Sequence, residues 1–188
     1  MKIFPKLIII VFAFMLIGFA NSSYAQASNF KIWSDSFINE DKIPLDYVSS
    51  QCGGSNKQPH LSWDSPPTGT KFYSIIMDDP DAQNVVGYTW VHLNLYNVPV
   101  NITSISEGQK IKDGRYRKNH NKQKSYTGPC APTGTHKYIF SIYALSEEVS
   151  SKYFGNFGAG AKAHSREKFE KLFSNIILGK SEYIGYWR

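Results

Sequence analysis

Three long segments rich in β-branched and aromatic residues constrain the fold of this chain most strongly. They cover residues 71–77, 88–96 and 136–145, and each has the length of a strand. A turn-forming run, Pro66-Pro67-Thr68-Gly69-Thr70, precedes the first of them. Shorter strand-like stretches occur at residues 30–34, 61–63 and 183–187. Strands separated by turns predict a mainly β chain that forms a single antiparallel β-sandwich-like domain.

One helix is predicted near the C-terminus. Apolar side chains recur there at positions i, i+3, i+4, i+7 and i+8, with charged residues around the rest of the helical wheel. These apolar residues are Phe169, Leu172, Phe173, Ile176 and Ile177. Gly179 supplies a stop signal. The expected fold is therefore a β-sandwich with a C-terminal helix and a final strand.

The first 25 residues have the pattern of a signal peptide. Lys2 and Lys6 form a basic start, residues 7–20 are nearly all apolar, and Ser23-Tyr24-Ala25 offers a cleavage site before Gln26. An uncleaved anchor is the alternative, but about 14 apolar residues fall short of the roughly 20 that span a bilayer. We expect an exported protein, periplasmic or secreted, with its domain at residues 26–188.

Two cysteines, Cys52 and Cys130, remain in the expected mature chain, each in a loop that carries glycine or proline. A pair of cysteines in an exported protein usually forms a disulfide. Sequence alone does not establish that the two Cα atoms come within the required ~7 Å, so two free thiols are the alternative. We expect the bridge.

Residues 109–125 form a polar, strongly basic segment. Its cations are Lys110, Lys112, Arg115, Arg117, Lys118, Lys122 and Lys124, and Asp113 is its single acid. Such runs can neutralise phosphates in nucleic acid or membranes. Only Tyr116 and Tyr126 are placed to stack on bases, which argues against nucleic acid. A solvated loop explains the same composition and is the preferred interpretation.

Acids and histidines gather where the predicted strands meet loops. Asp79-Pro80-Asp81-Ala82 follows one strand, His92 lies in the next, and His136 begins a later one. A period of two places His92 on one face with Tyr88, Trp90, Asn94 and Tyr96, and leaves the face with Val91, Leu93 and Leu95 as core. Either histidine alone is more often structural, and the acidic run alone could be a simple turn. Together they suggest a small anion site in which a carboxylate, Asp79, orients His92.

The loops and strand ends of the chain resemble the phosphatidylethanolamine-binding protein family, in its bacterial Raf-kinase-inhibitor-like branch. The resemblance runs from about residue 49 to residue 145 and continues more loosely to the C-terminus. The matching elements are Cys52-Gly53-Gly54-Ser55-Asn56, Pro59-His60-Leu61-Ser62-Trp63, Asp79-Pro80-Asp81-Ala82, Trp90-Val91-His92, Asn97-Val98-Pro99, Gly128-Pro129 and His136-Lys137-Tyr138. Gln83 stands where the family usually has proline, and Lys137 replaces an arginine.

The resemblance implies a β-sandwich with a small surface pocket for phosphate-like anions or phospholipid head groups. By position, its residues would be Asp79, His92, Pro129, His136 and Tyr138. The implied protein is a non-enzymatic binding or regulatory protein without a cofactor, and any protein partner and the oligomeric state stay open. The basic segment 109–125 departs most from the family pattern, so no role carries over to it.

Two other classes of site remain open. Cys130, or a serine near His136, could be a nucleophile activated by an imidazole, as in a hydrolase. The chain has no Gly-x-Ser-x-Gly elbow, and a disulfide would remove Cys130 from consideration. A metal site built from His60, His92, His136 and Asp79 is the other alternative, but these residues show no close ligand spacing.

Overall fold

The computed structural model describes residues 29–153 and 163–188. The predicted signal peptide and its cleavage site therefore lie outside the described residues. Among those that are described, no helix is long and apolar enough to cross a membrane.

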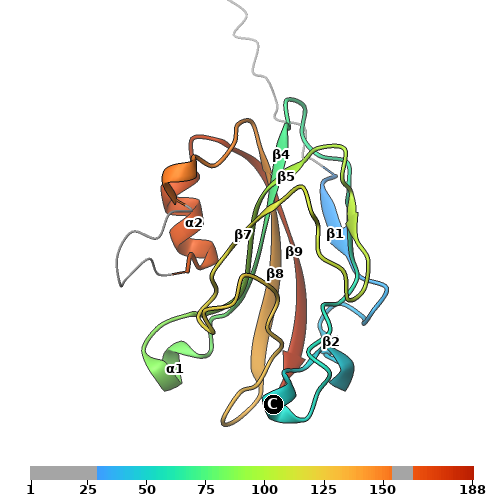
Figure 1. Ribbon diagram of the computed structural model, residues 1–188, viewed down its shortest axis with the longest axis vertical. Coiled ribbons are helices and arrows are strands. Elements are labelled where there is room, and N and C mark those ends of the chain that lie inside the picture. The colour runs from blue at the N-terminus through green and yellow to red at the C-terminus, as the bar shows by residue number, and fades with distance from the viewer. Residues whose placement is uncertain (1–28, 154–162) are drawn as a thin grey trace, which may run out of the picture.

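Two β-sheets pack face to face and form a sandwich, as the sequence predicts (Figure 1). The small sheet has the order β1 (Lys31–Trp33), β3 (Leu61–Asp64) and β6 (Ser104–Ile105). The large sheet has the order β2 (Asp41–Lys42), β9 (Ile177–Trp187), β8 (His136–Leu145), β4 (Phe72–Asp79), β5 (Trp90–Pro99) and β7 (Arg115–Arg117). Neighbouring strands are antiparallel, except that β2 runs parallel to β9.

The space between the sheets holds the main apolar core. Ile32, Leu61 and Trp63 of the small sheet meet Leu93, Leu95 and Phe140 of the large sheet. Leu93 and Leu95 thus lie on the core face that the period of two assigns to them. Tyr138 and Ile142 of β8 also point into this core. Burial of these side chains is the main force that holds the sheets together.

The outer face of the large sheet is covered by the helix α2 (Arg166–Phe173), so the molecule has three layers (Figure 1). Phe169 packs on Tyr96 of β5 and Tyr143 of β8, with ring centroids 5.4 and 4.7 Å apart. Both faces of β5 are therefore buried, although the alternating pattern marks only one of them as core. Long polar-tipped side chains such as tyrosine cover this face, so sequence alternation does not reveal its burial.

The C-terminal helix is shorter than predicted. It ends at Phe173, and the strand β9 already begins at Ile177 and includes Gly179. A Cβ atom on Gly179 would lie 2.8 Å from the Pro67 side chain, so this glycine allows close packing and does not end the helix. Ile176 and Ile177 fit the helical spacing of the sequence but lie beyond the end of the helix, because pairing of β9 with β8 takes precedence over local periodicity.

Candidate functional site

The candidate pocket lies at one end of the large sheet, where β4 ends and its neighbours β5 and β8 begin. Asp79 is the last residue of β4 and His136 is the first of β8, while His92 is the third of β5. Antiparallel pairing of β4 with both neighbours brings these three positions to the same end. In Figure 1 this is the end beside the short helix α1 (Gln83–Val86).

Asp79 holds His136, whereas the sequence pattern predicts that it orients His92. The Nδ1 atom of His136 donates to Oδ2 of Asp79 at 2.7 Å, and both side chains are buried. The other carboxylate oxygen accepts from the backbone N of Ala82 at 3.0 Å, so Asp79 also fixes the turn that follows β4. Burial raises the pKa of the Asp79 carboxyl, and the hydrogen bond from His136 opposes that rise.

Asp81, the second acid of the turn, joins the same two elements. Its Oδ2 accepts from the backbone N of Lys137 at 2.7 Å. The acidic turn is therefore both a turn-capping element and the anchor for the start of β8. The sequence left open whether this run is a simple turn or orients a histidine; in the structure, Asp79 both fixes the turn and holds His136.

His92 points toward the inner side of the sheet because β5 carries a bulge. Met77 pairs with Leu93 and Asp78 with Val91, so β5 has one extra residue at His92. A bulge turns the side chain that it contains. The imidazole lies 5.2 Å from the ring of Tyr138, whereas Tyr96 contacts His164 on the helix side of the sheet. The strict alternation that grouped His92 with Asn94 and Tyr96 is thus wrong at this position.

The environment of His92 keeps its ring neutral. The Nδ1 atom donates to the carbonyl oxygen of Thr127 at 2.8 Å, and the side chain is buried. Desolvation lowers the pKa of His92 to about 4. A charged His92 is therefore not part of the pocket near neutral pH.

The segment at residues 127–132 forms a second wall of the pocket. The backbone N of Gly128 donates to Oδ1 of Asn56 at 2.7 Å, and the carbonyl of Pro129 accepts from the backbone N of Ser49 at 3.0 Å. A Cβ atom on Gly128 would lie 2.3 Å from the carbonyl oxygen of Tyr47, so only glycine fits this close approach.

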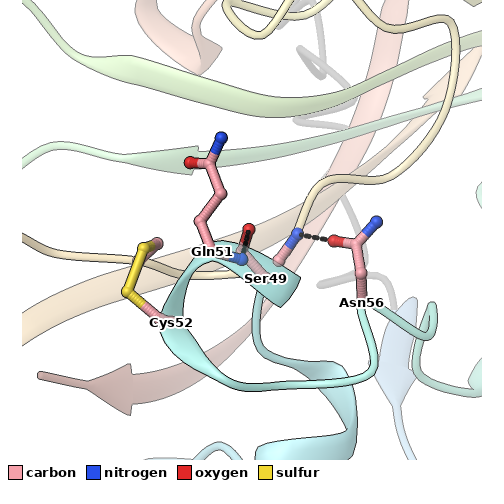
Figure 2. Close-up of a disulfide and its surroundings, with 6 residues drawn as sticks. Ser49, Gln51, Cys52 and Asn56 are labelled. Atoms are coloured by element: carbon pink, nitrogen blue, oxygen red, sulfur yellow. Dashed lines mark hydrogen bonds between the residues drawn. A yellow bond between two sulfur atoms is a disulfide. The ribbon is translucent and has the colours of Figure 1, made fainter.

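The disulfide between Cys52 and Cys130 closes this wall (Figure 2). The two Cα atoms are 5.5 Å apart, which is within the normal range for a bridge. Cys52 is the last residue of the short helix η2 (Ser50–Cys52), and Figure 2 shows the bridge beside Gln51 of this helix and its N-cap residue Ser49. The expected pairing is thus present, and the alternative of two free thiols does not apply.

The resulting cavity has a volume of about 240 Å³. Four of the five predicted ligand-binding residues line it: Asp79, His92, His136 and Tyr138. Pro129 does not line it, although its neighbours Gly128 and Cys130 do. Apolar side chains of Val85, Val86 and Trp90 complete one side, and no lysine or arginine lies among the described lining residues.

Tyr138 places a hydroxyl beside the two histidines. Burial raises the pKa of this phenol, so it stays a neutral donor. The backbone N–H groups of Cys130 and Ala131 lie close enough to oppose that rise, but within the described part of the chain no hydrogen bond to the hydroxyl has good geometry. A buried hydroxyl of this kind is costly without a partner, and a bound ligand could supply one.

The basic segment contributes to the pocket through its polar residues, which sequence reasoning missed. Oδ1 of Asn121 accepts from Nε1 of Trp90 at 3.1 Å, and Asn121 lines the cavity. The buried Asn119 donates to the carbonyl of His92 at 2.8 Å and to Oγ1 of Thr127 at 2.9 Å. The segment also supplies the edge strand β7, so it is only partly a solvated loop. The sequence signal for this contribution was the presence of uncharged asparagines within the basic segment.

Among the described residues, neither the thiol nucleophile nor the metal site that the sequence left open is assembled. Cys130 is in the disulfide, so it offers no thiolate nucleophile. His60 does not line the pocket; its Nδ1 accepts from the backbone N of Asp35 at 3.0 Å. Among residues 29–153 and 163–188, no group of three histidines, cysteines or acids is arranged to hold a metal ion.

Comparison with known proteins gives consistent matches along nearly the whole domain. The family model of the phosphatidylethanolamine-binding protein matches residues 33–188. A UPF0098 protein of Methanothermobacter thermautotrophicus is 32% identical over 157 residues, which cover 81% of this chain and 94% of that protein.

Two crystal structures share the fold. The Chlamydia trachomatis protein CT736 has a TM-score of 0.69 and 25% identity, and the match covers 85% of this chain and 97% of that one. Escherichia coli YbcL has a TM-score of 0.70 and 21% identity, with 85% and 98% covered. The family-model match, the archaeal relative and the fold agree, and the chain belongs to the phosphatidylethanolamine-binding protein family.

Proposed function

We propose that this protein is an exported, non-enzymatic binding protein whose pocket takes a small phosphate-like anion or a phospholipid head group. The observation that carries the proposal is the buried His136–Asp79 pair at the edge of the cavity. Because Nδ1 is bonded to the carboxylate, Nε2 is the ring nitrogen left for a ligand. In its protonated form, His136 donates a charge-assisted hydrogen bond to an anion while Asp79 balances the ring's charge.

The other lining groups suit a small and weakly charged head group. Tyr138 offers a neutral hydroxyl donor, and the neutral His92 offers no second positive charge. The described lining contains no lysine or arginine, so positive side-chain charge would come from a protonated His136. A singly charged phosphate group matches one histidine cation better than a highly charged anion does. The apolar rim of Val85, Val86 and Trp90 suits the uncharged part of such a ligand.

A binding role is favoured over hydrolysis by the state of the candidate nucleophile. The sulfur of Cys130 is bonded to that of Cys52. The hydroxyl of Ser49, which also lines the pocket, accepts from the backbone N of Gln51 at 3.3 Å and caps the short helix η2. We therefore expect purified protein not to turn over model esters; ester hydrolysis lost in C130A would contradict the proposal.

The proposal is tested by calorimetric titration with two soluble probes, glycerophosphoethanolamine and inorganic phosphate. Loss of a charge-assisted hydrogen bond costs roughly 1.5–3 kcal/mol of binding, so H136A should weaken binding by about tenfold or more. D79N should also weaken it, because the His136 ring loses the carboxylate that orients it and balances its charge.

H60A serves as the matched control, since His60 lies outside the pocket. Tighter binding of the phosphodiester than of free phosphate would identify a head-group site, and the reverse would identify a free-anion site. Absence of binding by the wild-type protein would contradict the proposal, as would equal affinity in H136A, D79N and wild type.

A further inference from the structure

The wall of the pocket consists of two segments far apart in sequence that the disulfide joins. One segment supplies Ser49 and Gln51 to the lining, and the other supplies Gly128, Cys130 and Ala131. The bridge spans 78 residues of sequence between Cys52 and Cys130. Since Cys130 itself lines the cavity, the bridge is part of the wall that a ligand would contact.

Among the described residues, the short backbone hydrogen bonds of this wall lie at Gly128 and Pro129, while the backbone N–H groups of Cys130 and Ala131 lie near the hydroxyl of Tyr138. The carbonyl of Pro129 accepts from Ser49, and Gly128 donates to Asn56, so residues 128–129 stay attached when the bridge opens. After Cys130 the chain passes through residues 132–135, all exposed, before it reaches His136. Opening the bridge would therefore leave the sandwich intact but release the stretch between Cys130 and His136, including Ala131 and Pro132 of the lining.

We propose that the Cys52–Cys130 disulfide is a redox-sensitive clamp that holds the pocket in its binding form. The inference rests on the proposed function of this pocket. The oxidised protein binds the anion, and the reduced protein binds it more weakly. A ligand in the pocket in turn protects the bridge, because Cys130 lines the space that the ligand fills.

The chemistry requires a dithiol reductant. One of its thiolates attacks a sulfur of the bridge and forms a mixed disulfide while the other cysteine leaves as a thiolate. The second thiolate of the reductant then attacks the mixed disulfide and releases the remaining cysteine. Two electrons and two protons pass to Cys52 and Cys130, and the reductant ends as a disulfide. Both cysteines are partly exposed, so a small dithiol can reach the bridge.

Ligand affinity and reduction potential are linked by thermodynamic reciprocity. If oxidation tightens ligand binding tenfold, a saturating ligand makes the reduction potential of the bridge about 30 mV more negative. This relation yields two independent readouts of the same coupling, one from binding and one from redox equilibrium.

The binding arm uses calorimetric titration of the whole protein with glycerophosphoethanolamine. Binding is measured in the oxidised state, after reduction with dithiothreitol, and in the variant C52S/C130S. The chain has two cysteines, so no other thiol responds to the reductant. We expect the reduced protein and the variant to bind at least tenfold more weakly than the oxidised protein. Reductant should leave the variant's affinity unchanged, and circular dichroism should show a folded protein in all three states.

The redox arm follows reduction of the wild-type bridge in dithiothreitol buffers with and without a saturating probe, and it does not depend on the folding of any variant. We expect slower reduction and a more negative potential when the probe is present, and neither effect in H136A. Equal affinity of oxidised and reduced protein, or a potential that the probe does not shift, would overturn the clamp while leaving the binding function intact. If the oxidised protein does not bind the probe, the proposed function fails and the clamp fails with it.

Discussion

At the scale of single residues, the two pocket histidines are equally buried but have different partners. His136 donates to the carboxylate of Asp79, whereas His92 donates to the carbonyl of Thr127. A carboxylate stabilises a positive ring strongly, and a carbonyl dipole in a buried site does so too weakly to offset desolvation. Desolvation accordingly lowers the pKa of His92 to about 4. His92 therefore remains a neutral scaffold, whereas the ring of His136 is held by a carboxylate.

The low pKa of His92 predicts that this ring takes up no proton when a ligand binds. Between pH 8 and 5.5, proton uptake on binding of glycerophosphoethanolamine should be the same in wild type and H92N, because His92 stays neutral in this range. The phosphodiester probe does not change its own charge there. Calorimetric titrations of both proteins at several pH values measure this uptake. A smaller proton uptake in H92N than in wild type would show that His92 becomes charged on binding.

His92 also predicts acid sensitivity of the fold. Its folded-state pKa of about 4 lies below the unfolded value of 6.5, so the unfolded chain binds a proton first as pH falls. Stability from the neutral ring is complete above pH 6.5 and is lost progressively down to about pH 4. The slope for one proton is about 1.4 kcal/mol per pH unit. H92N, which keeps an N–H donor for Thr127, should reduce the slope of unfolding free energy between pH 6 and 5.

Urea unfolding at closely spaced pH values measures this slope, with H60N as the control at a more exposed ring. His164, whose pKa desolvation lowers to about 3, adds a similar acid response that remains in both variants. An unchanged slope in H92N would show that the buried ring does not carry this part of the acid response.

At the scale of elements, α2 is attached to the large sheet by a polar anchor and an aromatic stack. The backbone N and Nε of Arg166 donate to the carboxylate of Asp78 at 2.8 and 2.7 Å, which ties the first turn of the helix to β4. Burial raises the pKa of Asp78, and the charge of Arg166 opposes that rise. Phe169 and Phe173 then cover Tyr96 and Tyr143. An eight-residue helix is too short to be stable by itself, so these contacts maintain it.

Comparing Phe169 with Leu172 tests whether burial or position in the helical pattern determines a residue's contribution to stability. Phe169 is fully buried, whereas Leu172 is 38% exposed although it belongs to the same sequence pattern. F169A should lower the unfolding free energy by about 3–5 kcal/mol through loss of buried area and an unfilled cavity. L172A should cost less than about 1 kcal/mol. Urea unfolding of both variants decides this, and equal losses would mean that the helix packs differently.

At the scale of the whole molecule, the pocket depends on segments from distant parts of the sequence. The strands β4, β5 and β8 supply Asp79, His92 and His136, and the disulfide joins a loop before the small sheet's β3 to the loop before β8. The sandwich core holds these strands rigidly, and the loops complete the cavity. A rigid sheet with loops at its end is a common way to position a binding site.

The exported state of the whole molecule is a prediction from sequence. The basic start, the short apolar run and Ser23-Tyr24-Ala25 predict that the mature protein begins at Gln26. Intact-mass analysis of exported protein should therefore show loss of residues 1–25. Exported material that still carries Met1 would contradict this prediction. An A25R variant, with a large charged side chain at the cleavage position, should accumulate as the uncleaved precursor.

Much of the fold could be read from local sequence. Residues 136–145 were predicted as a strand with the same bounds that β8 has, because β-branched and aromatic residues and flanking turns are local signals. The positions of Asp79, His92 and His136 near strand ends were also visible. The tertiary structure alone decided that Asp79 bonds to His136, that a bulge turns His92 toward Tyr138, and that Asn119 joins His92 to Thr127. Side-chain periodicity is set by neighbouring residues in the chain, whereas hydrogen-bond partners and bulges depend on strand pairing and packing between residues far apart in sequence.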